Sequence, residues 1–294
     1  MNIQKWLNLN TESLNGKTVA ISGSTGGLGK EICKHLASLG ADLILMDRNS
    51  TKSNEFITEL KYTFPNLKAR HIRLDLEDFN SVKEIAFTLK NTEFDVLIHN
   101  AGAYKIEKKI CSTGYGNIFQ INFLSPYYIT KELFDKIVKN SIKVVVVGSI
   151  AHNYSKTDAD NVDFHNKTAC SLIYGNAKRY LMFSLFKLFE NTNLISIVHP
   201  GITFTNITNH YPKLIFAIIK HPMKIIFNKP KTASLNIIKG IFDYTNTNEW
   251  IGPRLFNIWG SPNKKKLNTC TDEEITTMSN TAEAIYHKIK DLEK

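Results

Sequence analysis

Short apolar runs alternate along this chain with longer stretches in which apolar residues recur at helical spacing. The runs, rich in Val, Ile and Leu, occupy residues 18–23, 42–47, 68–76, 94–102, 143–149 and 194–201. The amphipathic stretches between them lie near residues 28–39, 50–63, 79–91, 115–139 and 172–191. Short, nearly all-apolar strands separated by helices are typical of a parallel sheet buried on both faces. The pattern therefore predicts the α/β class, with a doubly wound parallel sheet.

The same alternation predicts one domain rather than two. The chain has 294 residues, enough for one large domain, and it shows no repeat of fixed period and no low-complexity linker. We expect residues 1–15 to be an N-terminal extension. Residues 16–294 are expected to form a single domain with a small insertion after Gly201.

The region beyond Gly201 departs from the regular pattern. Residues 202–230 carry aromatic residues, prolines and the apolar run "LIFAIIKHPMKIIF" (214–227), and we expect a substrate loop or lid there. The run fits a helix packed on the core, a cover over an apolar substrate, or a peripheral membrane contact, since lysines flank its apolar residues. A last strand is expected near 254–259, and a polar helical tail over 261–294.

The first apolar run ends in a cluster of glycines, "SGSTGGLG" (22–29), and a helical pattern follows at once. At the carboxyl end of a parallel strand, glycines allow a tight turn and a close approach of the backbone to a ligand. The following helix then presents its N-terminal N–H groups to a phosphate. The stretch therefore favours a dinucleotide site with Gly23, Gly27 and Gly29 in the turn, over the plain turn that glycines also make.

The second run ends in "MDRN" (46–49), where an acidic and a basic residue suit different cofactors. Asp47 lies 18 positions past Gly29, close to the spacing at which a carboxylate accepts hydrogen bonds from the adenosine ribose. It would also repel the 2′-phosphate of NADP. Arg48 would instead hold that phosphate through a bidentate contact. Because Asp47 is expected to face the ribose, the sequence favours NAD, with NADP left open.

A series of segments follows the order of the motifs of a known family. They are "SGSTGGLG" (22–29), "LDL" (74–76), "HNAG" (99–102), "IFQINFLSPYYIT" (118–130), "VVVVGSIAH" (144–152), "YGNAK" (174–178) and "HPGITFT" (199–205). Together they resemble the classical short-chain dehydrogenase/reductase family over roughly residues 16–205. The "AH" after the serine and the long insert before the tyrosine look most like its retinol-dehydrogenase-like branch. The chain departs from the usual motifs at Ser22 (usually Thr), His99 (usually Asn) and Gly148 (commonly Ser).

The resemblance implies a Rossmann-like fold, a nicotinamide cofactor and a set of active-site residues without a metal. The catalytic residues that it implies are Asn122, Ser149, Tyr174 and Lys178. Asp75 would touch the adenine, and Asn122 would anchor a water that relays protons to Lys178. The residues that it implies for the cofactor are Ser22, Gly23, Ser24, Thr25, Gly27, Leu28, Gly29, Asp47, Arg48, Asp75, Leu76, Asn100, Ala101, Gly102, Tyr174, Lys178, Pro200, Gly201, Ile202 and Thr205.

Tyr174 and Lys178 have a spacing that suits acid–base chemistry. Four residues apart on a predicted helix, they share a face. Tyrosine has an unperturbed pKa of about 10, and a nearby cation lowers this pKa by stabilising the phenolate. We expect Tyr174 to exchange a proton with the substrate and Lys178 to lower the pKa of its hydroxyl and bind the nicotinamide ribose. Ser149, at the end of a strand, is expected to hydrogen-bond the substrate oxygen.

These residues favour an NAD(P)-dependent oxidoreductase that moves a hydride between the cofactor and an alcohol or carbonyl carbon of a small, lipophilic molecule. Two alternatives stay open. Gly23, Gly26 and Gly29 also fit GxxGxxG, the loop of the extended branch, which implies an epimerase or dehydratase acting on a nucleotide sugar. The second is a cofactor-binding regulatory protein without catalysis, against which the intact set of polar residues argues.

Composition and charge argue against several classes of protein, namely nucleic-acid-binding, metal-binding, secreted and membrane-spanning proteins. The net charge is +10, with basic residues scattered apart from Lys264, Lys265 and Lys266, and an anionic ligand or surface would suit this excess. Without a basic helix or zinc-finger spacing, no nucleic-acid partner is expected. The four cysteines lie far apart without a C-x-x-C pair, as in a protein of the reducing cytoplasm that holds no metal. We expect no signal peptide and no membrane-spanning segment.

The stretches near 115–139 and 172–191 carry more apolar residues than one face of a sheet can cover. Members of the family that the chain resembles pair through the corresponding helices. We therefore expect a homodimer or homotetramer that binds a small-molecule substrate.

Overall fold

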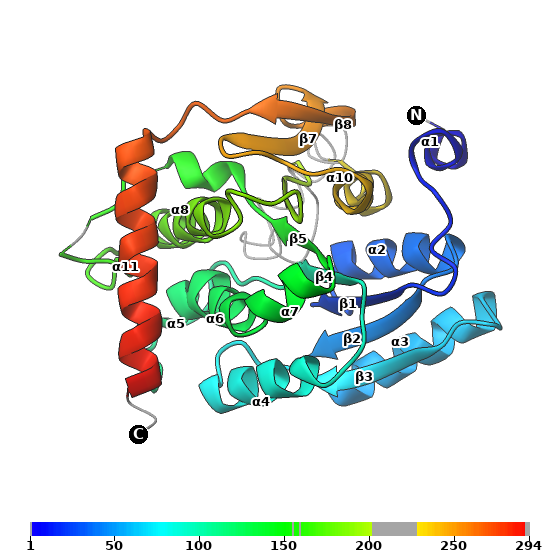
Figure 1. Ribbon diagram of the computed structural model, residues 1–294, viewed down its shortest axis with the longest axis horizontal. Helices are drawn as coiled ribbons and strands as arrows, with labels where there is room; N and C mark the ends of the chain where they lie inside the picture. Colours follow the sequence, from blue (N-terminus) through cyan, green and yellow to red (C-terminus); the bar gives the residue numbers. More distant parts are fainter. Residues whose placement is uncertain (1, 155, 159, 202–227, 292–294) are drawn as a thin grey trace, which may run out of the picture.

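The protein, seen in a computed structural model, is described over residues 2–154, 156–158, 160–201 and 228–291. Within these residues, eight strands form one sheet in the order β3-β2-β1-β4-β5-β6-β7-β8 (Figure 1). The strands are β1 (Thr18–Ser22), β2 (Asp42–Asp47), β3 (Ala69–Arg73), β4 (Val96–His99), β5 (Lys143–Val147), β6 (Ile195–Val198), β7 (Glu249–Leu255) and β8 (Trp259–Lys266). Most of the expected substrate loop, including the run 214–227, lies outside the described residues.

The pairing of the strands confirms the predicted doubly wound fold. Each neighbouring pair from β3 to β7 is parallel, and only β8 of the described strands runs antiparallel to its neighbour. The strand order reverses between β1 and β4, from which the chain proceeds outward in opposite directions. Ligands of such sheets bind beside this reversal, at the carboxyl ends of the strands. The topology therefore places the candidate site at the ends of β1 and β4.

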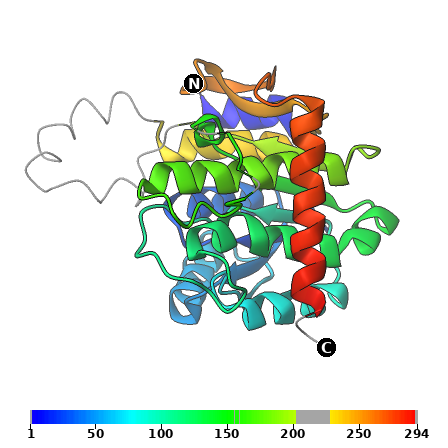
Figure 2. The same ribbon diagram turned by 90° about the vertical axis from the view of Figure 1, so that its left-hand side faces the viewer.

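Helices cover both faces of the sheet (Figures 1 and 2). One face carries α1 (Ile3–Asn10), α2 (Gly27–Ser38), α3 (Ser50–Thr63) and α10 (Pro230–Phe242). The other carries α4 (Phe79–Lys90), α6 (Ser125–Glu132), α8 (Cys170–Leu188) and α11 (Asp272–Asp291). Along β1, Val19 and Ile21 pack in the core under α2, α3 and α10, and Ala20 packs in the core on the opposite face. The strand is therefore buried on both sides, as its apolar run predicts. Every helix in the described ranges is too short or too polar to span a bilayer.

The last part of the sheet differs from the single strand that we expect near 254–259. There, β7 and β8 form an antiparallel hairpin whose turn contains Phe256 and Asn257, both with positive φ. The pattern missed β8, "WGSPNKKK", because an edge strand needs no apolar run. This strand also occupies the start of the expected polar tail, so that the helix begins only at Asp272.

The stretch 115–139, expected as one helix, is divided into several pieces. They are α5 (Asn117–Phe119), a π-helical turn (Gln120–Leu124), α6 and α7 (Phe134–Lys139). Pro126 has no N–H, so it cannot donate the α-helical hydrogen bond to the carbonyl of Asn122. The N–H of Ser125 instead donates to the carbonyl of Gln120, five residues back. The widened turn carries Asn122, and a pattern of apolar positions cannot reveal it.

Helix α11 covers α6 and α8 from outside (Figures 1 and 2). Its apolar side chains, among them Ile275, Met278 and Ile285, belong to the larger core. The Tyr127 hydroxyl and the Lys131 ammonium of α6 both donate to Glu283 at 2.7 Å. The apolar residues of 115–139 and 172–191, from which we expect an oligomer, are thus packed against α11 of the same chain. The oligomeric state stays a prediction, and pairing would need another face.

Glu132 joins α6 to α11 through an ionic network in which its own carboxylate is largely covered and the two lysines are partly exposed. Its carboxylate lies 2.6 Å from both Lys90 Nζ and Lys290 Nζ, and it accepts a hydrogen bond from the Tyr286 hydroxyl. Burial alone would raise the pKa of Glu132, but the hydrogen bonds from Lys290, Lys90 and Tyr286 lower it to about 2. Folding therefore stabilises the ionised carboxylate.

We expect Glu132→Gln to lower the free energy of unfolding by about 1–3 kcal/mol at neutral pH. Because folding depresses this pKa, the contribution is present above the ordinary pKa of Glu and is lost as the pH falls through about 2. Urea unfolding across that range measures it. Glu93→Gln, whose side chain is 93% exposed beside Lys136, is the control and should change little. A loss that is equal at neutral pH and near pH 2 would contradict the ionic role.

Candidate active site

A cavity of about 860 Å³ opens at the carboxyl ends of β1, β2, β4 and β5. It brings together most of the residues that the sequence predicts for the cofactor and the chemistry. These are Gly23, Thr25, Gly27, Leu28, Gly29, Asp47, Arg48, Asp75, Leu76, Asn100, Ala101, Gly102, Ser149, Tyr174, Lys178, Pro200 and Gly201. Ser22, Ser24 and Asn122 are buried behind its wall. Ile202 and Thr205 lie outside the described residues.

The glycine loop between β1 and α2 has a shape that side chains would prevent. Gly23 has a φ of +71°, and a Cβ at Gly29 would lie 2.1 Å from the Gly23 carbonyl oxygen. Gly26, which precedes α2, has no side chain that could cap the first turn. Backbone and helix N-terminus therefore face the cavity, as a phosphate-binding loop requires.

Ser22 and Asn100 hold this loop against the end of β4. The Ser22 hydroxyl accepts hydrogen bonds from the N–H groups of Asn100 and Ala101 at 3.2 and 3.1 Å. The Asn100 side-chain amide donates to the carbonyls of Ser22 and Gly23, both at 3.0 Å. Both residues support the loop from inside the protein, whether or not they also touch a ligand.

Asp47 is buried, and its carboxylate is surrounded by donors from the protein. One oxygen accepts from the N–H and the hydroxyl of Thr25 at 3.2 and 3.1 Å. The other accepts from the hydroxyl of Ser53 at 3.1 Å and from that of Ser24. Four donors fill the roughly four lone-pair positions of a carboxylate. Asp47 thus fastens β2 and α3 to the glycine loop, while Arg48 next to it is exposed at the cavity.

The N-terminal part of α8 places Tyr174 beside Ser149, which follows β5. Gly175 makes this possible, because a Cβ there would lie 2.3 Å from the carbonyl oxygen of Ala151. Burial raises the pKa of Tyr174 to about 12, and a hydrogen bond with Ser149 opposes this rise. The ring of Tyr104 packs edge-on against Tyr174, with centroids 5.3 Å apart. Tyr174 therefore holds its proton at neutral pH.

Lys178 lies one helical turn further, on the same side of α8. Its Nζ donates to the Val147 carbonyl at 2.9 Å and lies 5.8 Å from the centre of the Tyr174 ring. Burial lowers the pKa of Lys178 to about 8. A Cβ at Gly102 would approach Lys178 Nζ to 3.7 Å and Asn122 Oδ1 to 2.8 Å. The missing side chain of Gly102 thus lets the segment after β4 lie against both Asn122 and Lys178.

Asn122 is held in the π-helical turn by its own side chain. The amide donates to the carbonyls of Ala103 and Ile118 at 2.7 and 2.8 Å and accepts from the N–H of Ala103 at 3.2 Å. These bonds occupy the Asn122 side chain. Its backbone carbonyl, in contrast, receives no α-helical hydrogen bond from position 126, because Pro126 has no N–H. A water relay would therefore start from that carbonyl.

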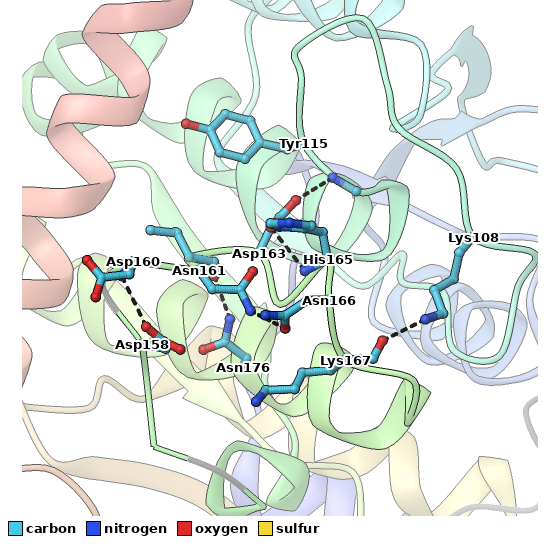
Figure 3. Close-up of polar contacts among 12 residues, drawn as sticks. Lys108, Tyr115, Asp158, Asp160, Asn161, Asp163, His165, Asn166, Lys167 and Asn176 are labelled. Atoms are coloured by element: carbon cyan, nitrogen blue, oxygen red, sulfur yellow. Dashed lines mark hydrogen bonds and ion pairs between the residues drawn. The ribbon is translucent and has the colours of Figure 1, made fainter.

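The insert between Ser149 and Tyr174 is tied to two other elements (Figure 3). Asp163 accepts a hydrogen bond from the N–H of Gly116 at 2.8 Å, and Asn176 of α8 donates to the Val162 carbonyl at 2.7 Å. Asp163 also contacts the ring of His165 at 3.1 Å. These bonds hold the start of α8, and with it Tyr174, against the helical region that carries Asn122.

The histidines near the site have roles that the sequence revealed only in part. From the sequence alone, His152 and His165, near Ser149 and without metal-like partners, would be solvated loop residues. The structure instead buries His152, whose ring nitrogens lie 2.6 Å from the Ser149 carbonyl oxygen and 3.1 Å from Thr269 Oγ1. Thr269 is 117 positions away, so no local pattern could show this contact. His199 packs on Trp250 with ring centroids 4.8 Å apart, as expected for a strand end. His165 is largely exposed.

Sequence reasoning also missed several residues of the cavity wall, including Lys52, Tyr104 and Tyr154. Tyr104 directly follows the "NAGA" segment at the end of β4, a position that could have marked it. Lys52 lies in the first turn of α3, close to Arg48.

Comparisons with known proteins agree with this geometry. The family model described as "short chain dehydrogenase" matches residues 17–159. An uncharacterised oxidoreductase of Schizosaccharomyces pombe is 28% identical, covering 75% of this chain and 70% of its own length. Retinol dehydrogenase 12 of Mus musculus is 28% identical, covering 66% and 64%. A solved structure from Mycobacterium paratuberculosis shares the fold, with a TM-score of 0.69, 20% identity and 95% of both chains covered.

We expect Gly175→Ala to lower kcat/KM by about 10- to 100-fold, because the added Cβ must push α8 or Ala151 away and separate Tyr174 from Ser149. Affinity for the cofactor, measured by fluorescence titration, should change only a few-fold. Gly252→Ala is the matched control, since its Cβ would lie 3.6 Å from the nearest atom, in ordinary contact. Wild-type turnover in Gly175→Ala would show that the close approach is not needed.

Proposed function

Because the chain belongs to the short-chain dehydrogenase/reductase family, we propose that it interconverts an alcohol and a carbonyl group of a small lipophilic molecule with a nicotinamide cofactor. The observation that carries the proposal is the gathering of Tyr174, Ser149 and Lys178 beside the glycine loop, at one edge of the sheet. Screening alcohols and carbonyls with NAD and NADP, in both directions, tests it at the absorbance of the reduced cofactor.

The cavity fits a dinucleotide. The space that side chains at Gly23 and Gly29 would fill is left to the backbone, and α2 begins there without a side-chain cap. The glycine loop would hold the pyrophosphate, Asp75 and Leu76 the adenine, and Asn100 to Gly102 the region toward the nicotinamide. When bound, the nicotinamide supplies or accepts the hydride.

The protein's own part in the chemistry is to hold the substrate oxygen and move one proton. Tyr174 keeps its proton at neutral pH, so it is prepared to donate it to a carbonyl oxygen that becomes an alcohol. Ser149 would hydrogen-bond the same oxygen. Lys178, whose pKa is about 8, would stabilise the phenolate that Tyr174 leaves behind and take part in its reprotonation.

A lipophilic substrate is supported by the wall beside Tyr174. Tyr104, Tyr154, Ile121 and Ile150 line this end of the cavity and offer aromatic and aliphatic surface. The name of the relative retinol dehydrogenase 12 also points to an apolar alcohol. The substrate panel should therefore extend from short polar alcohols to long-chain and aromatic ones.

The cofactor that we propose is NADP, although the sequence favoured NAD. The sequence argument needs an Asp47 carboxylate that is open to the ribose, whereas Ser24, Thr25 and Ser53 already occupy both its oxygens. Arg48 and Lys52 are exposed and line the same end of the cavity. The charges of Arg48 and Lys52, beside an Asp47 carboxylate that the protein already hydrogen-bonds, suit a 2′-phosphate.

We expect Tyr174→Phe to lower kcat by about 10²- to 10⁴-fold and to leave cofactor affinity nearly unchanged. The ring and its packing on Tyr104 stay, while the hydroxyl that carries the proton is removed. Steady-state kinetics and a cofactor titration check the two parts separately. Turnover within a few-fold of the wild type would remove Tyr174 from the mechanism.

We expect Arg48→Gln to lower kcat/KM with NADP by about 10- to 100-fold, because a charged hydrogen bond to the phosphate is lost. With NAD the same variant should stay within a few-fold of the wild type. Arg70→Gln, at an exposed arginine of β3 outside the cavity wall, is the matched control. A wild-type enzyme that prefers NAD tenfold would contradict the assignment.

A further inference from the structure

The turn between β7 and β8 exposes large apolar side chains. Phe256 is 81% exposed, Leu255 53% and Trp259 36%. Phe256 and Asn257 have positive φ, which turns the chain sharply and keeps these side chains at the tip of the hairpin. Single exposed apolar residues are common, but three within five positions at one tip form a patch.

The described chain that leads to and follows this patch is rich in basic residues. Between residues 228 and 271 the sequence has seven lysines and arginines against Asp243 and Glu249, so half of the net charge of +10 lies there. Asp243 is paired with Lys239 and Lys264, and no acidic residue lies between 250 and 271. The described chain around the tip therefore carries an excess of positive charge.

Exposed cations lie on the hairpin and on the adjoining chain. Arg254 is exposed on the hairpin beside Leu255, and Lys229 and Lys231 are exposed at the start of α10. The Asn228 side chain donates to the carbonyl of Ile258 in the hairpin turn, so Lys229 follows directly on a residue that touches the tip. The apolar tip thus has a positively charged border.

The tip also lies next to the cavity. Pro200 and Gly201 line the cavity wall. A Cβ at Gly201 would lie 3.0 Å from the carbonyl oxygen of Ile258, which stands between Phe256 and Trp259 in the sequence. Whatever binds the tip is therefore close to the wall of the candidate active site.

We propose that the β7–β8 tip docks this protein on the surface of an anionic lipid bilayer, with Phe256, Leu255 and Trp259 among the acyl chains near the headgroups. Lysine and arginine around an inserted aromatic residue are the features of interfacial binding. A second copy of the chain fits less well, because pairing tip to tip would bring two basic borders together. The patch of three side chains is also small beside a stable dimer interface of roughly 1,200 Å² or more.

The benefit of this docking rests on the proposed function. A lipophilic alcohol or carbonyl compound dissolves in the bilayer, and an entrance beside the docked tip would receive it without passage through water. Docking itself needs neither cofactor nor turnover, so the two proposals can fail separately.

The test is co-sedimentation of the full chain with phosphatidylcholine vesicles, with and without phosphatidylserine. We expect binding to the mixed vesicles and little to the neutral ones, with loss at high salt. Phe256→Asn should lower the bound-to-free ratio about tenfold. Asn tolerates the positive φ, so the fold is kept. Phe87→Asn, which removes a 70% exposed phenylalanine from α4 at the far end of the molecule, is the matched control and should bind like the wild type (Figure 1).

Three results would overturn the proposal. One is wild-type protein that stays in the supernatant with both kinds of vesicle. Another is equal loss of binding in Phe256→Asn and Phe87→Asn. The third is a wild type of twice the 33.4 kDa chain mass by light scattering that Phe256→Asn converts to monomer, because the tip would then pair copies. Binding to mixed vesicles without turnover of any tested compound would support docking and count against the proposed function alone.

Discussion

Helix α8 can lie against the segment that follows β5 only because Gly175 has no side chain. The rest of the candidate site depends on this approach. The carbonyl of Ala151 occupies the place of the missing Cβ, and Tyr174 is thereby brought to Ser149. Asn176, the next residue, fixes the insert through Val162, and Lys178 reaches Val147 at the end of β5. A helix displaced outward by one carbon radius would lose these contacts together, since side chains on one rigid helix cannot adjust separately.

Burial in this packed site shifts the pKa values of its two ionisable partners in opposite directions. It raises that of Tyr174 to about 12 and lowers that of Lys178 to about 8, in each case toward the uncharged form. His99, close behind them, has a pKa lowered to about 3 and stays neutral. The protein alone therefore leaves a low-charge environment around the reacting oxygen, in which any charge that develops is felt strongly. The glycine loop adds an electropositive end at which a dinucleotide would place its phosphates.

The sequence predicted those parts of the structure that depend on local spacing. Apolar runs gave the parallel strands, glycines marked the loop before α2, and four-residue spacing placed Tyr174 and Lys178 on one face. The sequence could not predict contacts between segments that lie far apart along the chain. Asp47 looks like a ribose-binding carboxylate until Ser24 and Ser53, from two other elements, are seen to donate to it. His152 looks solvated until Thr269 is found beside its ring. The π-helical turn had a visible cause in Pro126, but its effect on Asn122 follows only from the geometry.

The C-terminal region illustrates why polarity alone is a poor guide to exposure. Helix α11 is polar by composition, yet its apolar stripe is buried on α6 and α8, and Glu132 fixes it there with charges from three elements. The β7–β8 hairpin lies on a basic stretch, yet it exposes Phe256, the most exposed phenylalanine of the described chain. The helix thus covers an apolar face far from the cavity, while the hairpin exposes Phe256 beside it. An exposed apolar tip beside the candidate site, with lysine and arginine around it, fits a contact with something both apolar and anionic.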